Sequence, residues 1–122
     1  MALQELVNEI LEFDSRKELQ DSNLPTIRNL LFFSNALAGE TGEVANDVKK
    51  ILRDGPSTKL LEELREELID VLIYIIKLAI LTNTNLDKEW KNKMEILEQR
   101  WEERTEGYWH TKRDVDERIF LS

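Results

Sequence analysis

The sequence contains no cysteine and only one histidine, and both shortages narrow its chemistry. Without cysteine the chain has no disulfides, no thiolate metal ligands and no thiol nucleophile. The single histidine, His110, lies near the C-terminus with no candidate partner nearby in the sequence, which argues against a Ser-His nucleophile. It also argues against a di-iron four-helix protein, because such proteins use a Glu-x-x-His motif on two helices. The absence of cysteine fits a reducing compartment, and we expect a cytoplasmic protein.

Long apolar runs are also missing. The most apolar segment, Val71–Leu81, is too short for a membrane span and contains Lys77. The first residues lack the basic and apolar regions of a signal peptide, so none is expected. Acidic residues outnumber basic ones by 25 to 17, which gives a formal net charge of −8. Because this charge repels phosphate backbones, we expect no nucleic-acid polymer as a partner. An anionic small molecule is compatible with it where a divalent cation overrides the local field.

Proline and glycine are scarce, with two and four residues, and apolar residues recur mostly every three or four positions. This pattern predicts an all-α fold, a bundle of four to five helices. We expect one domain over residues 1–104 and a tail over residues 105–122 that packs on a neighbouring subunit or is mobile. A polar link at about residues 14–24 is either a simple connection or a flap over a site. The expected helices cover about residues 3–13, 25–52, 59–83 and 86–104.

The third expected helix changes character halfway along. Its first half is amphipathic, whereas its second half, VLIYIIKLAIL, is apolar nearly all round and requires burial on most sides. A chain of 122 residues cannot easily surround such a helix. We therefore expect burial against another subunit, in a homodimer or homotetramer. A single chain that folds fully around the helix is the alternative.

Two acidic pairs are the strongest candidates for a site. Glu40 and Glu43 lie three residues apart in AGETGEVAND, and Glu67 and Asp70 repeat this spacing in the third helix. A spacing of three places both carboxylates of a pair on one helix face, about 5–6 Å apart at Cβ. Such carboxylates on two antiparallel helices can hold Mg²⁺ or Mn²⁺, which take oxygen ligands and retain waters. A glycine precedes each glutamate of the first pair, which predicts close approach of a helix or ligand.

A metal site of this kind predicts hydrolysis of a polyphosphate by direct attack of water, without a protein nucleophile. Glu43 is the first candidate to orient or deprotonate the water, with Glu40 beside it. Lys93 and Arg100, seven residues apart on the fourth helix, would neutralise the outer phosphates. Acidic pairs on a charged helix are often only a solvated surface. The alternative function is therefore a non-catalytic helical module for oligomerisation or interaction.

The third helix also carries a continuous polar seam beside its apolar face, formed by Glu63, Glu67, Asp70, Tyr74 and Lys77. We expect Lys77 to be a buried counter-ion to Asp70 or to another acid near Tyr74, rather than a catalytic group. Trp90 and Trp101, at helical spacing on the fourth helix, are expected to be core residues rather than a platform for base stacking.

Several segments resemble the MazG-like all-α nucleoside triphosphate pyrophosphohydrolases. That family carries E-x-x-E, a gap, and E-x-x-D; here Glu40-x-x-Glu43 is followed by 23 residues and then by Glu67-x-x-Asp70. The similarity covers about residues 31–101. The segments that carry it are AGETGEV followed by VKK, then EELIDVLIYIIKLA, TNLDKEW and KMEILEQRW.

The resemblance implies hydrolysis of a (deoxy)nucleoside triphosphate, for example a purine such as dGTP, to the monophosphate and pyrophosphate. It also implies a dimer or a dimer of dimers with two or more Mg²⁺ ions per site, or Mn²⁺ in their place. A dUTPase-like activity and a phosphoribosyl-ATP step are alternatives within the enzyme class, and base and sugar preference stay open. The implied metal ligands are Glu40, Glu43, Glu67 and Asp70, and the implied substrate contacts are Lys93, Arg100, Lys50 and Tyr74.

Overall fold

The computed structural model describes residues 3–103, which form four α-helices and one short 3-10 helix. This confirms the predicted all-α fold. The expected tail over residues 105–122 and His110 lie outside the described residues. In chain order the elements are α1 (Leu3–Arg16), η1 (Gln20–Asn23), α2 (Ile27–Asp54), α3 (Thr58–Leu81) and α4 (Leu86–Glu103).

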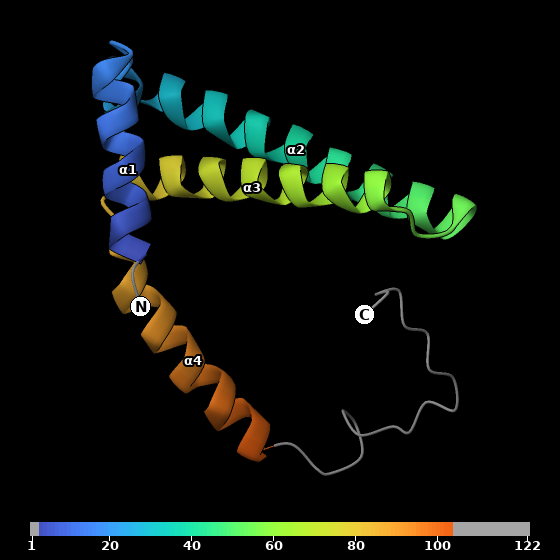
Figure 1. Ribbon diagram of the computed structural model, residues 1–122. Coiled ribbons are helices and arrows are strands. Elements are labelled where there is room, and N and C mark those ends of the chain that lie inside the picture. The colour runs from blue at the N-terminus through green and yellow to red at the C-terminus, as the bar shows by residue number, and fades with distance from the viewer. Residues whose placement is uncertain (1–2, 104–122) are drawn as a thin grey trace.

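The long helices α2 and α3 form an antiparallel hairpin, and α1 crosses this hairpin at one end (Figure 1). From the start of α1, helix α4 extends away from the hairpin (Figure 1). The Asp87 carboxylate at the start of α4 accepts hydrogen bonds from the backbone N–H groups of Leu3 and Gln4, at 3.1 and 3.2 Å. A carboxylate is favourable at this position, because the first N–H groups of a helix lack partners within the helix. Asp87 therefore joins the starts of α1 and α4.

Local signals in the sequence set the ends of the hairpin helices. The Thr26 hydroxyl caps α2 by accepting a hydrogen bond from the backbone N–H of Asn29 at 3.1 Å. Pro25 precedes this cap, so α2 begins two residues after the start of the expected range. Gly55 ends α2 with a φ of 83°, a left-handed conformation that favours glycine. The Ser57 hydroxyl caps α3 in the same way, because it accepts a hydrogen bond from the backbone N–H of Leu60 at 3.1 Å.

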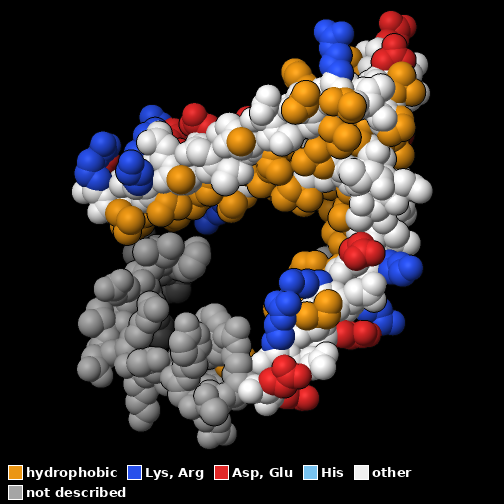
Figure 2. Space-filling model, turned by 180° about the vertical axis from the view of Figure 1, so that it is seen from behind, with side chains coloured by type: hydrophobic (Ala, Val, Ile, Leu, Met, Phe, Trp, Pro, Cys, Tyr) orange, Lys and Arg blue, Asp and Glu red, His pale blue; other side chains and the backbone are white. Residues whose placement is uncertain are grey.

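The apolar core of the described chain is small. Many large apolar side chains lie at the surface, and Figure 2 shows them gathered along the hollowed side of the molecule. Trp90 and Trp101 are 51% and 48% exposed, so the expectation that they are core residues is wrong for the single chain. Among the described residues, α4 packs mainly against α1, so the α2–α3 hairpin does not enclose its apolar side chains. The buried apolar side chains are Val7, Phe33, Ile51, Ile76, Ala79 and Leu81.

Lys77 is buried and organises the polar link between α1 and α2. Its Nζ donates to Asp14 Oδ2 at 2.6 Å, to Ser22 Oγ at 2.8 Å and to Asn23 Oδ1 at 2.6 Å. It also lies 4.9 Å from the centre of the Phe33 ring, within range of a cation–π interaction. The prediction of a buried counter-ion is therefore right, but its partner is Asp14 and not Asp70. These bonds tie the link to α3.

None of the helices within residues 3–103 combines the length and the apolar character that a membrane crossing requires.

Candidate metal centre

Three of the four predicted metal ligands meet on the α2–α3 hairpin. Glu40 of α2 and Glu67 and Asp70 of α3 each offer one carboxylate oxygen, and these three oxygens all lie within 4.8 Å of one another. All three side chains are partly buried, because they lie at the edge of the packed faces of the two helices. Oxygen ligands of an octahedral Mg²⁺ lie roughly 3–4 Å apart, given metal–oxygen distances of about 2.0–2.1 Å. Small side-chain rotations would therefore bring this donor set onto one hard cation.

The neighbouring carboxylates raise the pKa of Glu67. The nearby Glu40 carboxyl, with which a proton can be shared, is the largest cause that raises the pKa of Glu67 from 4.5 to about 7. Burial and the negative charges of Glu40, Asp70 and Asp47 are the other causes of the same rise. One oxygen, Glu67 Oε2, is buried without a hydrogen-bond partner. A divalent cation would satisfy this oxygen and offset the repulsion.

The fourth predicted ligand, Glu43, is exposed and lies outside the group of three. Asp47, which was not predicted as a site residue, is buried instead, and its Oδ2 has no hydrogen-bond partner. At 100° per residue, Asp47 returns to within about 20° of the direction of Glu40 after two turns of α2. That spacing is the signal in the sequence that points to Asp47.

The predicted substrate-binding residues are dispersed in the single chain. Lys50 is partly buried on α2, and the Tyr74 ring of α3 lies 6.1 Å from the Phe33 ring, centre to centre. Lys93 and Arg100 are exposed on α4, which extends away from the hairpin (Figure 1). The described chain therefore does not bring these two basic side chains to the acids on its own hairpin.

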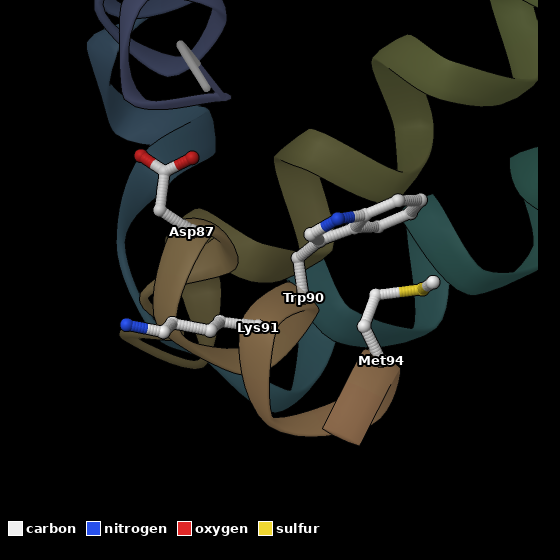
Figure 3. Close-up of a pocket in the computed structure, with 4 residues that line it drawn as sticks. All are labelled: Asp87, Trp90, Lys91 and Met94. Atoms are coloured by element: carbon white, nitrogen blue, oxygen red, sulfur yellow. The ribbon is translucent and has the colours of Figure 1, made fainter. Parts of the chain in front are cut away.

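Two surface hollows lie along α4, beside its tryptophan side chains and away from the acidic group. One, of about 390 Å³, is lined by Asp87, Trp90, Lys91 and Met94 (Figure 3). Another, of about 490 Å³, is lined by Leu97, Glu98, Trp101 and Glu102. Neither contains a carboxylate of the candidate metal centre.

The two glycines in the first acidic motif are not explained by packing within the described chain. A Cβ placed on Gly39 or Gly42 would meet no atom within 4 Å. The expected close approach of a helix at these positions is therefore absent from residues 3–103. The surface at these two glycines is therefore open to a ligand or to a helix of another subunit.

The raised pKa of Glu67 predicts how the stability of the metal-free protein depends on pH. A carboxyl group whose pKa is higher in the folded than in the unfolded state stabilises the fold while it is protonated. The melting temperature should therefore fall as the pH rises from about 4.5 to about 7. Mn²⁺ should raise it more at pH 7.5 than at pH 5, because the cation competes with the proton. Calorimetry of the wild type and Glu67→Gln would check this, and an equally steep fall in the variant would contradict it.

Comparison with known proteins finds a matching family and a curated relative. The family described as the MazG nucleotide pyrophosphohydrolase domain matches residues 29–105, a range that includes both acidic pairs. The relative, the Gene 37 protein of Mycobacterium phage L5, is 44% identical over 57 residues. The aligned part is 44% of this chain and 50% of that protein, so the match spans half of the relative's length. The name of the phage protein states no activity.

Proposed function

This chain belongs to the MazG nucleotide pyrophosphohydrolase family, and from that membership we propose that it hydrolyses a (deoxy)nucleoside triphosphate to the monophosphate and pyrophosphate. The observation that carries the proposal is the grouping of Glu40, Glu67 and Asp70 within 4.8 Å. A purine deoxynucleotide such as dGTP is the proposed substrate, and the proposed role is control of the nucleotide pool.

Glu40, Glu67 and Asp70 would hold Mg²⁺, or Mn²⁺ in its place, with Glu43 beside them on α2. The bound cation would lower the pKa of a water ligand and neutralise phosphate charge. The oxygen of the attacking water forms a new bond to the α-phosphorus, and the bond from the α-phosphorus to the oxygen that bridges it to the β-phosphorus breaks. Pyrophosphate leaves, and Glu43 takes the proton of the water. The exposure of Glu43 supports this role, because a base must be able to reach the water.

Lys50, Tyr74, Lys93 and Arg100 are the proposed substrate contacts. The two on α4 lie away from the acids of their own chain, which favours an assembly in which α4 of one subunit approaches the hairpin of another. The many exposed apolar side chains on α2, α3 and α4 support the same homodimer or homotetramer, because burial between subunits would remove them from water. Basic side chains supplied in this way would neutralise the phosphates that leave.

A screen for pyrophosphate release would test the proposal. It would use the eight common (d)NTPs, oxidised and methylated derivatives, and phosphoribosyl-ATP, each with Mg²⁺ or Mn²⁺ and with EDTA. We expect release from at least one nucleotide, lost with EDTA, and the preferred substrate would separate the dGTP, dUTP and phosphoribosyl-ATP alternatives. No release from any of them at any metal concentration would reject the enzyme. A non-catalytic module would also keep the same melting temperature when Mg²⁺ and nucleotide are added together.

A further inference from the structure

Two buried carboxylate oxygens in the described chain have no hydrogen-bond partner, and they come from opposite helices of the hairpin. One is Asp47 Oδ2 on α2, and the other is Glu67 Oε2 on α3. Asp47 as a whole is only 5% exposed. Buried charged groups in proteins are normally paired or bound to a metal, because burial removes the water that would otherwise solvate them. These two oxygens therefore call for a cationic partner.

No side chain within residues 3–103 supplies that partner. The ion pairs found there join Arg53 to Asp54 and Lys77 to Asp14. Lys77 is buried and uses its donors on Asp14, Ser22 and Asn23. In place of a positive neighbour, Asp47 faces negative charge, since it is one of the groups that raise the pKa of Glu67.

The helix geometry makes Asp47 and Glu67 converge. Asp47 lies on the same face of α2 as Glu40 and about two turns closer to the turn of the hairpin. Side chains on a helix lean toward its N-terminus. In this antiparallel pair Glu67 therefore leans toward the hairpin turn, where Asp47 lies, and Asp47 leans back toward Glu67. The convergence is on the hairpin-turn side of the group formed by Glu40, Glu67 and Asp70.

We propose that Asp47, an acid outside both predicted pairs, acts with Glu67 to hold the second of the divalent cations that the family resemblance implies, next to the position shared by Glu40, Glu67 and Asp70. This inference rests on the proposed metal centre and extends it to an acid outside both predicted pairs. Glu67 would contribute to both positions, because its carboxylate has two oxygens. Mg²⁺ and Mn²⁺ are the matching ions, because every donor is a carboxylate oxygen. A second cation would place additional positive charge beside a bound triphosphate.

Mn²⁺ binding without nucleotide, measured by calorimetry and by electron paramagnetic resonance, would test the subsite. The wild type should bind two ions per chain, and Asp47→Asn should lose one or bind it at least about tenfold more weakly. Glu66→Gln removes an exposed acid next to Glu67 and should keep both ions. Glu40→Gln should weaken the other ion. Asp47→Asn with two ions of wild-type affinity, or a wild type with one ion that Asp47→Asn retains, would overturn the subsite and leave the proposed function intact.

A wild type without any Mn²⁺ affinity would reject the whole metal centre, so the two failures are distinguishable. The melting temperature of the metal-free variants separates metal binding from a structural role. Asp47→Asn removes a negative charge that faces Glu67, so it should melt no lower than the wild type without metal. It should gain less than the wild type when Mn²⁺ is added. A metal-free variant that is unfolded or melts lower would show that Asp47 is structural and would overturn the inference.

Discussion

Glu67→Gln is expected to lower kcat for nucleotide hydrolysis by about 10³-fold or more, while the folded structure is retained. The neighbouring carboxylates raise the pKa of Glu67, and Glu67 offers one oxygen to the proposed metal site with Glu40 and Asp70. A bound metal ion stabilises the charge of the transition state by several kcal/mol, and each 1.36 kcal/mol is about tenfold in rate. The loss should appear in kcat as well as in metal affinity, measured by pyrophosphate release at saturating Mg²⁺.

The same substitution should make the metal-free protein more stable at pH 8. The wild-type Glu67 has a pKa raised to about 7 by its neighbours, so at pH 8 its charged form is held against repulsion. The neutral amide removes that repulsion and can donate to a neighbouring carboxylate. Lower activity together with a higher melting temperature is the combination that a damaged fold would not give. Glu66→Gln, at an exposed neighbouring position, should change neither quantity, and near-normal activity of Glu67→Gln would contradict the role of this residue.

Lys77→Met is expected to cost about 3–5 kcal/mol of the free energy of unfolding, because it leaves the Asp14 carboxylate buried without its counter-ion. Asn23 still donates to Asp14 at 3.0 Å, but Ser22 and Asn23 both lose their contact with Lys77. Chemical denaturation monitored by circular dichroism would measure the loss. Combining Lys77→Met with Asp14→Asn should recover part of it, since the unpaired charge is then gone.

The exposed ion pair between Arg53 and Asp54 provides the matched control. Its N–O distance is 2.7 Å, nearly the same as the 2.6 Å between Lys77 and Asp14, but its side chains are 71% and 50% exposed. Arg53→Ala should therefore cost less than about 1 kcal/mol, because water solvates both charges and screens their attraction. A similar small loss for Lys77→Met would show that the buried network contributes little to stability.

The parts of the fold that depend on local sequence could be predicted, and the parts that depend on distant packing could not. The Ser57 cap and the end of α2 at Gly55 depend only on neighbouring residues. The partner of Lys77 lies 63 residues away, on a helix that crosses the end of the hairpin. No periodic pattern encodes that crossing, so the sequence predicted a buried counter-ion but the wrong acid.

The candidate metal centre could also be predicted only in part. Spacing predicted which acids share a helix face, and three of the four predicted ligands do meet. Glu43 points about 60° from Glu40 around α2, whereas Asp47 returns to within about 20° of it. The helix repeat alone therefore contains the difference between an exposed and a buried acid. The face of α2 that is buried depends on where α3 packs against it, and the sequence does not show this position.

If the proposed assembly forms, the small core of the single chain makes its folding depend on its own abundance. Side chains such as Phe32, Ile69 and Trp90 remain more than half exposed in the single chain. In the proposed assembly they are shielded only when folded copies meet, so each association event draws chains out of the unfolded population. Dilution would reverse this effect without any change in temperature or solvent. The rate at which a cell synthesises the chain would then help to determine what fraction of it is native.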